Sequence, residues 1–342
     1  MADIVLGLGT SHGPLLNTPP SRWGERARFD RTNQALAYRG RDYSFDDLLE
    51  LRGAGFGAEC APEVQEKRHA ACRAALDALG AIVADSDVDT LVIVSGDHKE
   101  IFSDEVLAPF TIYTGENVDH VPFTEEQLAA MPPGLAVAAV GDVPAVRTVR
   151  PCDAELAVHL VREAGAAGFD PASSAALPAG RYGNRGIPHG WGFVYQQLLL
   201  GQPSLGEAPT PFVPVFVNTF YEPTPPSAAR CYAFGRALGA ALRSSGAPAR
   251  RVGLVASGGL SHFVVDEQLD RDFLAALVAK DERWLTELDP ATLRSGTSEL
   301  RNWIVVAGAL ADTGLDAEVI DYQPCYRTEA GTGCAMGFAA WR

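Results

Sequence analysis

The chain has 342 residues, of which 47% are hydrophobic and 21% charged. A chain of this length and composition buries a large core, as one big α/β domain or as two smaller ones. Its 28 Lys and Arg against 43 Asp and Glu give a formal charge of −15, which disfavours nucleic acid or an anionic membrane surface as the main partner. A small anionic ligand stays compatible with this charge where a local Arg or Lys receives it.

The first residues and the cysteines predict a cytoplasmic protein. The start MADIVLGLGTSHGPLL carries an acid where a signal peptide carries positive charge, and Gly and Pro interrupt it too early for a membrane span. The six cysteines are sparse and include no Cys-x-x-Cys pair, which indicates reduced thiols. We therefore read Ile4 to Leu8, closed by Gly9, as a strand buried on both faces.

The segment from Asn17 to Cys60 differs in kind from what precedes it. It is rich in arginine, aromatic residues and glycine, and we expect an insertion lying over the edge of the core. Its functional interpretation is a lid or a wall of a substrate pocket, and a structural surface excursion is the alternative.

The remainder alternates helices and strands. Apolar residues near a 3.6-residue spacing predict a helix from Glu63 to Ala84, and DTLVIVSGDH then supplies a strand. Further helices are predicted at 153–164, with Asp153 as its cap, and at 227–244, and further strands at 212–217 and 252–256. This alternation predicts one α/β domain over residues 1–342, layered α/β/α, with a largely parallel or mixed central sheet.

Three predicted strands run into Gly or Ser and then a histidine. The segments IVLGLGTSHGPLL, VIVSGDHKEIF and VGLVASGGLSHFV deliver His12, His98 and His262. Functional groups of open α/β sheets gather outside the carboxyl ends of the strands, so these three are expected to share a site. The other histidines in predicted helices or a polar loop are interpreted as surface or satisfied core residues: His69, His120 and His159.

A carboxylate would complete a metal site. Imidazole suits divalent iron, zinc and copper, and two imidazoles with one carboxylate leave open positions on Fe(II). Glu299 is the best-placed candidate, in the first turn of a helix that Ser295 or Ser298 could cap. An acid in a first turn is also favoured by the helix dipole alone, so spacing does not select Glu299, and His262 stays open as a third ligand.

Five segments, taken together, resemble a known family. TSHGPLL, VIVSGDHKEIF, IPHGWGFVY, GGLSHFV and TSELRNWIVVAGAL, spread over residues 10–310, are similar to segments of class III extradiol ring-cleavage dioxygenases (LigB-like), related to the protocatechuate 4,5-dioxygenase β subunit. They occur in the order of that family. RTNQALAYRGRDYSFDDLLELR further resembles the subgroup that acts on gallate and 3-O-methylgallate.

The resemblance implies specific roles for the residues. His12, His98 and Glu299 would bind Fe(II), whereas His262 and His189 would act on the bound substrate. A histidine held off the metal takes a proton from the diol at a pKa close to working pH, so this assignment replaces the three-histidine grouping. The implied reaction cleaves the ring of a catechol or pyrogallol-type acid (gallate, 3-O-methylgallate or protocatechuate-like) with O2, in a homo-oligomer expected to be a dimer.

One position departs from the family. Related enzymes often place an acid before the histidine matching His189, and this chain has Pro188 there. We therefore predict that the carboxylate which would orient or polarise the imidazole is missing.

The residues that would bind the substrate are chosen by chemistry. A benzoate-type carboxylate needs a cationic partner, and the candidates are Lys99, Arg181, Arg185, Arg301 and Arg327. Aromatic residues around His189 could wall the ring, although aromatic residues after a loop are also ordinary core. The predicted substrate-binding set is Arg181, Tyr182, Arg185 and Trp191.

Two other functional classes stay open. A non-oxidative metal-binding or peptidase-like protein could share the fold, because fold does not fix function. Tightly bound zinc without oxygen uptake would favour it. The chain could also be a subunit that needs a small partner chain, unless the insertion fills that role; activity of the isolated chain would decide.

Overall fold

A computed structural model of the chain describes residues 1–132, 134–181, 185–200 and 210–342. Its strands are β1 (Asp3–Thr10), β2 (Leu36–Tyr38), β3 (Arg41–Tyr43), β4 (Thr90–Gly96), β5 (Phe110–Tyr113), β6 (Asn117–His120), β7 (Thr148–Pro151), β8 (Ala172–Ser174), β9 (Phe212–Val217), β10 (Arg251–Ser257), β11 (His262–Val264), β12 (Ala317–Tyr326) and β13 (Thr332–Trp341). Its α-helices are α1 (Gly24–Thr32), α2 (Phe45–Arg52), α3 (Pro62–Asp85), α4 (Glu125–Ala130), α5 (Leu135–Ala139), α6 (Ala154–Ala166), α7 (His189–Val194), α8 (Ala228–Arg243), α9 (Glu267–Ala279), α10 (Glu282–Thr286) and α11 (Leu300–Leu310).

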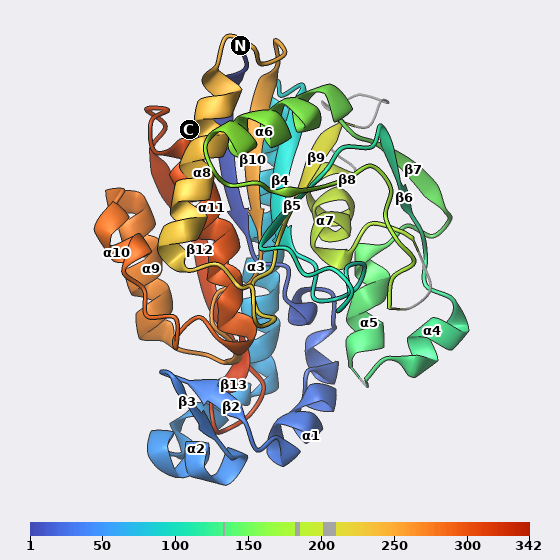
Figure 1. The fold of residues 1–342 in the computed structure, drawn as a ribbon. Coiled ribbons are helices and arrows are strands. Elements are labelled where there is room, and N and C mark those ends of the chain that lie inside the picture. The colour runs from blue at the N-terminus through green and yellow to red at the C-terminus, as the bar shows by residue number, and fades with distance from the viewer. Residues whose placement is uncertain (133, 182–184, 201–209) are drawn as a thin grey trace.

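A nine-stranded sheet forms the centre of the part that the structure describes (Figure 1). Its order is β11-β13-β1-β10-β4-β9-β5-β8, and β12 pairs with β13. The four strands β1, β10, β4 and β9 run parallel to one another, whereas β13 and β5 run antiparallel on either side of them. The predicted α/β domain with a mixed central sheet is therefore confirmed.

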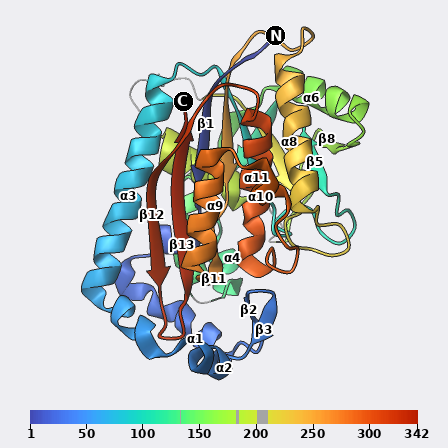
Figure 2. The ribbon, with the colours of Figure 1, turned by 90° about the vertical axis from the view of Figure 1, so that its left-hand side faces the viewer.

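Helices cover both faces of this sheet. Figure 2 shows α3 on one side of the strands and α8, α9 and α11 on the other. The strand β4 illustrates the pattern: Leu91 and Ile93 belong to the core cluster under α3 and α7, while Val92 and Val94 belong to the cluster under α8 and α11. Successive side chains of a strand point to opposite faces, so a strand buried on both faces is apolar throughout.

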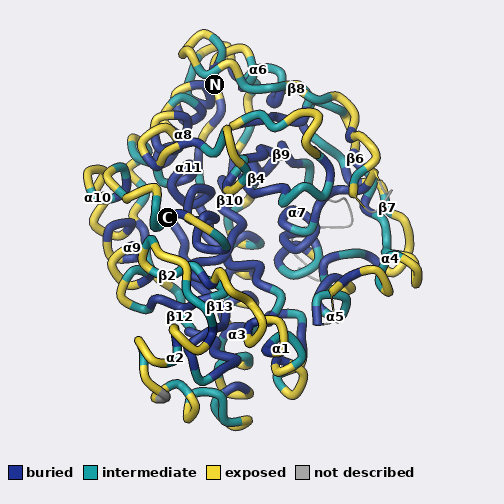
Figure 3. Tube along the Cα trace, turned by 60° about the horizontal axis from the view of Figure 1, so that its bottom comes forward, coloured by how far each residue is buried: buried dark blue, intermediate teal, exposed yellow. Residues whose placement is uncertain are grey.

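The buried core follows the strands. Figure 3 shows buried residues along the sheet and exposed residues on peripheral elements such as α2, α4 and α10. Two of the predicted helix starts are confirmed: the side chain of Asp153 accepts from a backbone N–H at the start of α6, and that of Ser227 does the same for α8. Among the described residues, no helix is both long and apolar enough to cross a membrane.

The segment from residue 17 to residue 60 folds into small elements of its own. It contains α1, the hairpin of β2 and β3, and α2, which lie below the main sheet in Figure 1. Trp23 is fully buried, and Asp30 of α1 forms a buried ion pair with Arg327, which follows β12. The segment is thus attached to the β12–β13 hairpin through a buried charge pair.

Candidate active site

Three neighbouring parallel strands deliver histidines to one edge of the sheet. β1 ends at Thr10 shortly before His12, and β4 ends at Gly96 shortly before His98. β10 lies between these two strands and continues through a short loop to His262, the first residue of β11. The structure brings the three strand-end histidines together, as the sequence pattern suggests.

The carboxylate of Glu299 contacts all three imidazoles. Its Oε1 lies 3.3 Å from Nε2 of His12 and 2.5 Å from Nε2 of His98. Its Oε2 lies 3.9 Å from Nε2 of His262 and accepts a hydrogen bond from the backbone N–H of Gly259. Only 3% of the Glu299 side chain is exposed, so protein groups rather than bulk water surround this charge.

The local structure at Glu299 differs from the expected one. Glu299 ends a 3-10 helix, Ser295–Glu299, and α11 begins at the next residue. No side chain caps either helix start, so the prediction that Ser295 or Ser298 caps this helix was wrong. The tighter turn moves the start of α11 past Glu299 and leaves its carboxylate at the strand ends.

Hydrogen bonds at Nδ1 determine which nitrogen of two imidazoles carries a lone pair. The hydroxyl of Ser257 donates to the carbonyl of Gly190 at 2.6 Å, so it accepts from Nδ1–H of His12 at 2.9 Å. Nδ1 of His262 lies 2.9 Å from the carbonyl of Leu260, which only accepts, so this nitrogen also carries the hydrogen. Each Nε2 therefore presents its lone pair on the side of the carboxylate.

The charges at the site match this tautomer assignment. Burial lowers the pKa of both His12 and His262 despite the neighbouring carboxylate. Although burial alone favours the neutral acid, His12 and His262 hold the pKa of Glu299 well below its usual range. The lowered pKa of Glu299 favours the ionised carboxylate, and the lowered pKa of His12 and His262 favours loss of their protons, which is the direction that metal binding requires.

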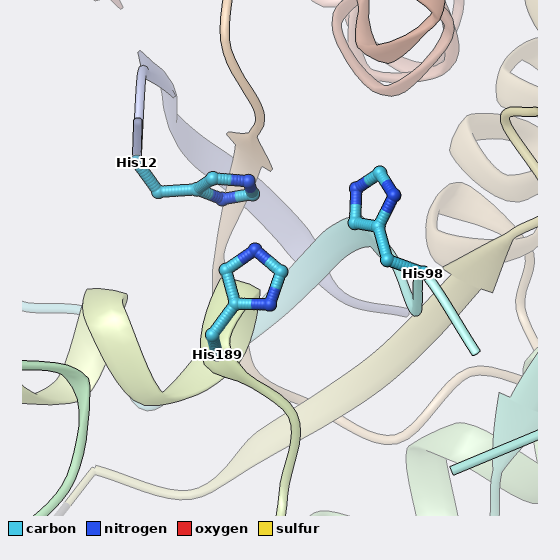
Figure 4. A group of neighbouring side chains, drawn as sticks. All are labelled: His12, His98 and His189. Atoms are coloured by element: carbon cyan, nitrogen blue, oxygen red, sulfur yellow. The ribbon is translucent and has the colours of Figure 1, made fainter. Parts of the chain in front are cut away.

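These donors fit a divalent metal ion. A carboxylate oxygen and an imidazole lone pair that face each other repel unless a cation lies between them. The side-chain nitrogens of His12, His98 and His189 also lie within 4.8 Å of one another, and Figure 4 shows their rings facing a common space. His12 and His98 thus belong to two sets of potential ligands, completed either by Glu299 or by His189.

His189 differs from the other site histidines because a carboxylate holds its Nδ1. Glu100 accepts from Nδ1 and, at 3.1 Å, from the backbone N–H of His189 at the start of α7. Although burial opposes it, Glu100 and this hydrogen bond raise the pKa of His189 to about 10. An imidazolium at neutral pH has no lone pair, so its Nε2–H is a hydrogen-bond donor rather than a metal ligand.

This arrangement corrects the expectation drawn from Pro188. The sequence predicts that the carboxylate which orients the His189 imidazole is missing, because proline replaces the usual acid. The prediction was wrong, since Glu100 supplies the carboxylate from the loop after β4. A residue far from His189 in the sequence thereby supplies the carboxylate that Pro188 cannot supply.

The site opens into a cavity of about 390 Å³. Its polar side is formed by His12, His98, His189, His262 and Glu299. Its apolar lining includes Pro14, Phe123, Met131, Leu135, Phe220 and Phe263. A cavity of this size and lining suits a small aromatic ligand that carries a few polar groups.

The four predicted substrate-binding residues lie in different places. Arg181 lines the cavity, whereas Arg185 is exposed and does not appear among the described lining residues. Trp191 is fully buried in the core, where its indole N–H donates to a backbone carbonyl of β4, so the structure does not place it at the cavity. Tyr182 lies outside the described residues.

The other cationic candidates have partners within the protein. Lys99 pairs with Asp104 at 2.6 Å. Arg301 is buried and donates to three backbone carbonyls at 2.6 to 2.8 Å. Arg327 lines the cavity, but its guanidinium is occupied by Asp30 through two hydrogen bonds of 2.5 and 2.8 Å.

Strained backbone conformations gather around the cavity. His98, Phe263 and Ser295 all line it and have φ values of 49°, 62° and 53°. Left-handed backbone is rare for residues other than glycine and costs roughly 1–3 kcal/mol per residue, so it persists where surrounding structure enforces it. This clustering of strain is typical of a functional site.

A comparison with known families gives the broader assignment. Residues 56–333 match the family described as the catalytic LigB subunit of aromatic ring-opening dioxygenase. The chain belongs to this family. This membership agrees with the resemblance seen in the sequence.

One curated relative of this LigB-family chain comes from Paraburkholderia xenovorans (strain LB400). It is a 2,3-dihydroxyphenylpropionate/2,3-dihydroxicinnamic acid 1,2-dioxygenase, 31% identical over 205 residues, which are 59% of this chain. The aligned part spans about half (51%) of the relative's length. Among solved structures, an uncharacterized protein, JW3007 from Escherichia coli K12, aligns over 98% of this chain and 99% of its own, with 15% identity and a TM-score of 0.44.

Sequence reasoning missed two residues at the cavity of this LigB-family chain. Glu100 stands in VIVSGDHKEIF, two positions after His98, and that motif offered the only sequence signal for it. Arg26 lies in the arginine-rich segment and lines the cavity, yet no pattern distinguishes it from the exposed arginines around it.

Proposed function

We propose that the chain is a non-haem, Fe(II)-dependent extradiol dioxygenase acting on a vicinal diol of an aromatic acid. The observation that carries this proposal is the convergence of Glu299 with the Nε2 atoms of His12 and His98 at the strand ends. Family membership supports the reaction class. A homodimeric, cytoplasmic enzyme is the corresponding prediction for the whole molecule.

In this proposal His12, His98 and Glu299 hold the metal. Two imidazoles and one carboxylate leave positions open on Fe(II), which suits chemistry with a diol and O2 better than a closed structural site. The bound Fe(II) would supply the electron exchange that lets a diol react with O2. His189 is the competing third ligand, and its hydrogen bond to Glu100 favours a role as a donor instead.

The other two histidines would handle protons and orientation. Nε2 of His262 carries a lone pair because Nδ1 bonds the carbonyl of Leu260, so it can accept a proton from a diol hydroxyl. Nε2–H of His189 can donate to an oxygen of the substrate, since Glu100 keeps the imidazole protonated. The apolar wall of the cavity would hold the ring and exclude water.

The relative's name supports cleavage outside the diol. It pairs a 2,3-dihydroxyphenyl substrate with a 1,2-dioxygenase, and the 1,2 bond lies beside the 2,3-diol rather than between its hydroxyls. Gallate, 3-O-methylgallate and protocatechuate are the further candidates that the sequence resemblance adds. All of these compounds carry a vicinal diol and a carboxylate.

The proposal is tested with protein purified without oxygen and loaded with Fe(II). An oxygen electrode would follow uptake with 2,3-dihydroxyphenylpropionate, gallate, 3-O-methylgallate, protocatechuate and catechol. We expect stoichiometric oxygen consumption with at least one carboxylated diol, and none from a Glu299→Ala variant. His159→Gln is the matched control, because His159 is satisfied by Ala241 and Ser244 far from the cavity.

Absence of uptake with every diol in iron-replete protein would reject the dioxygenase proposal. Tightly bound zinc without oxygen uptake would instead favour the non-oxidative alternative. Activity of the isolated chain would show that no small partner chain is required.

A further inference from the structure

Arg26 is a charged residue on the cavity wall that the proposed reaction does not use. It lies in the first turn of α1, is half-buried and lines the same cavity as His12, His262 and Glu299. Burial, followed by the nearby Arg327, lowers its pKa. A guanidinium still remains charged at neutral pH, so burial without an anion costs free energy.

The carboxylates nearest to Arg26 in the chain are committed to other arginines. Asp30 accepts two hydrogen bonds from Arg327 and one from the hydroxyl of Thr332 at 2.6 Å. Glu25 accepts two from Arg22, at 2.6 and 3.0 Å. Within the described ranges, Arg26 has no carboxylate within ion-pair distance.

The acids on the cavity wall are likewise occupied. Glu299 faces the imidazoles, and Glu100 holds His189. Asp142 accepts a hydrogen bond from Asn17 at 2.7 Å, and burial raises its pKa to about 8. No anion of the described cavity wall therefore balances Arg26.

Arg26 lies on the cavity wall where α1 meets Gly134, just before α5. His262 of β11 is directly opposite Cys334 of β13, and Nη1 of Arg327 lies 3.7 Å from Sγ of Cys334. Arg26 lines the same cavity as Arg327 and Cys334. A ring whose diol binds at the histidine cluster would extend its substituent into the cavity that Arg26 also lines.

We propose that Arg26 binds the carboxylate of the aromatic substrate and so selects acids over neutral diols. The proposal rests on the proposed function, because it assumes that the diol binds at the histidine cluster. The planar guanidinium can donate two parallel hydrogen bonds to a carboxylate, which a lysine cannot. The N-terminal segment would thus contribute a specificity residue to a site built by the strand ends.

The test compares an acid with its neutral counterpart in matched variants. The acid pairs are protocatechuate with its methyl ester, and 2,3-dihydroxyphenylpropionate with its methyl ester. The variants are Arg26→Met, which keeps an apolar stem, and Arg26→Lys, which keeps the charge. Arg28→Met is the matched control, because Arg28 lies on the same helix, is exposed and lines a different surface depression.

Arg26→Met should lower kcat/KM for the acid by roughly 10- to 100-fold, as expected for one lost hydrogen-bonded charge pair, while the ester changes little. Arg26→Lys should recover part of the loss, and Arg28→Met should match the wild type. Anaerobic titration of the tryptophan fluorescence with the same compounds should show the same ratio in Kd. This second measurement does not depend on turnover.

An unchanged preference for the acid in Arg26→Met, in both kinetics and binding, would overturn the proposal. An equal loss for acid and ester would also overturn it, because a purely structural role predicts that result. A selective loss in Arg181→Met in place of Arg26→Met would transfer the role to Arg181. Wild-type protein without oxygen uptake would reject the proposed function, and the binding titrations would still decide the role of Arg26.

Discussion

At the scale of single residues, the acceptor of the Nδ1–H hydrogen bond determines what each imidazole of the site can do. His12 donates to Ser257 and His262 donates to a backbone carbonyl, so both have a lone pair at Nε2. His189 donates to Glu100 and is protonated. The group that accepts from Nδ1–H therefore decides what Nε2 of each ring can do. Nε2 of a neutral ring can bind a metal or accept a proton, whereas Nε2–H of a protonated ring can only donate.

The first residue-scale prediction separates metal binding from proton transfer. His12→Ala should lower the iron content, because one of three proposed protein ligands is lost. His262→Ala should keep the iron content near that of wild type and lower kcat by roughly 10²- to 10⁴-fold, as for a lost general base. Metal analysis and steady-state kinetics on the same preparations provide the measurement.

Two outcomes would change this assignment. Loss of iron from His262→Ala would restore the three-histidine site that the strand-end pattern suggests. Loss of iron from His189→Ala, with full iron in Glu299→Ala, would instead favour the set formed by His12, His98 and His189. His159→Gln should leave both the iron content and kcat unchanged.

At the scale of elements, α1 is held against the β12–β13 hairpin by two charge pairs of different burial. Arg327 and Asp30 are 1% and 6% exposed, whereas the neighbouring pair of Arg31 and Glu329 is 49% and 32% exposed. The two pairs connect the same elements and differ mainly in solvent access. They therefore form a matched comparison of buried and exposed ion pairs.

Asp30→Ala should destabilise the protein by about 3–5 kcal/mol, because it leaves the buried guanidinium of Arg327 without its partner. Glu329→Ala should cost no more than about 1 kcal/mol, since an exposed pair contributes little. Urea unfolding curves give both values, and limited proteolysis should show earlier cleavage within residues 17–60 of the Asp30 variant. Equal effects of the two substitutions would contradict this explanation of how α1 is attached.

At the scale of the whole molecule, one buried histidine links stability to pH. His120 is fully buried, its Nε2–H donates to the carbonyl of Asp142 at 2.8 Å, and its Nδ1 accepts from Arg150 at 3.4 Å. Burial, together with Arg150, lowers its pKa to about 4. Protonation at Nδ1 would direct an N–H toward a guanidinium, so the folded state favours the neutral ring.

Because the folded-state pKa lies below the unfolded value of about 6.5, the unfolded chain takes up the proton first as pH falls. His120 should therefore cost stability progressively between about pH 6.5 and pH 4, up to about 3 kcal/mol, and nothing further below that range. His120→Gln, whose amide can still donate and accept, should make the free energy of unfolding depend less on pH between about pH 6.5 and pH 4. Urea unfolding of metal-free protein at several pH values measures it, and parallel wild-type and variant curves would contradict the prediction.

The residue pattern alone was enough to predict the four parallel strands β1, β4, β9 and β10, the helices α3, α6 and α8, and the meeting of histidines at strand ends. These features follow from local physical causes: apolar runs of strand length, capping side chains at Asp153 and Ser227, and a parallel sheet whose carboxyl ends share one edge. The motifs also placed the chain in a family of ring-opening dioxygenases, in agreement with the comparison.

How the site residues are paired depends on packing between segments that lie far apart in the chain. Glu100 replaces the acid that Pro188 excludes, Trp191 lies in the core, and Arg26 reaches the cavity while Arg327 is occupied by Asp30. Each of these facts depends on contacts between residues far apart in the chain. Such contacts arise when α1, the β4 loop and the β12–β13 hairpin pack together, and no local pattern of residue types encodes which charge takes which partner.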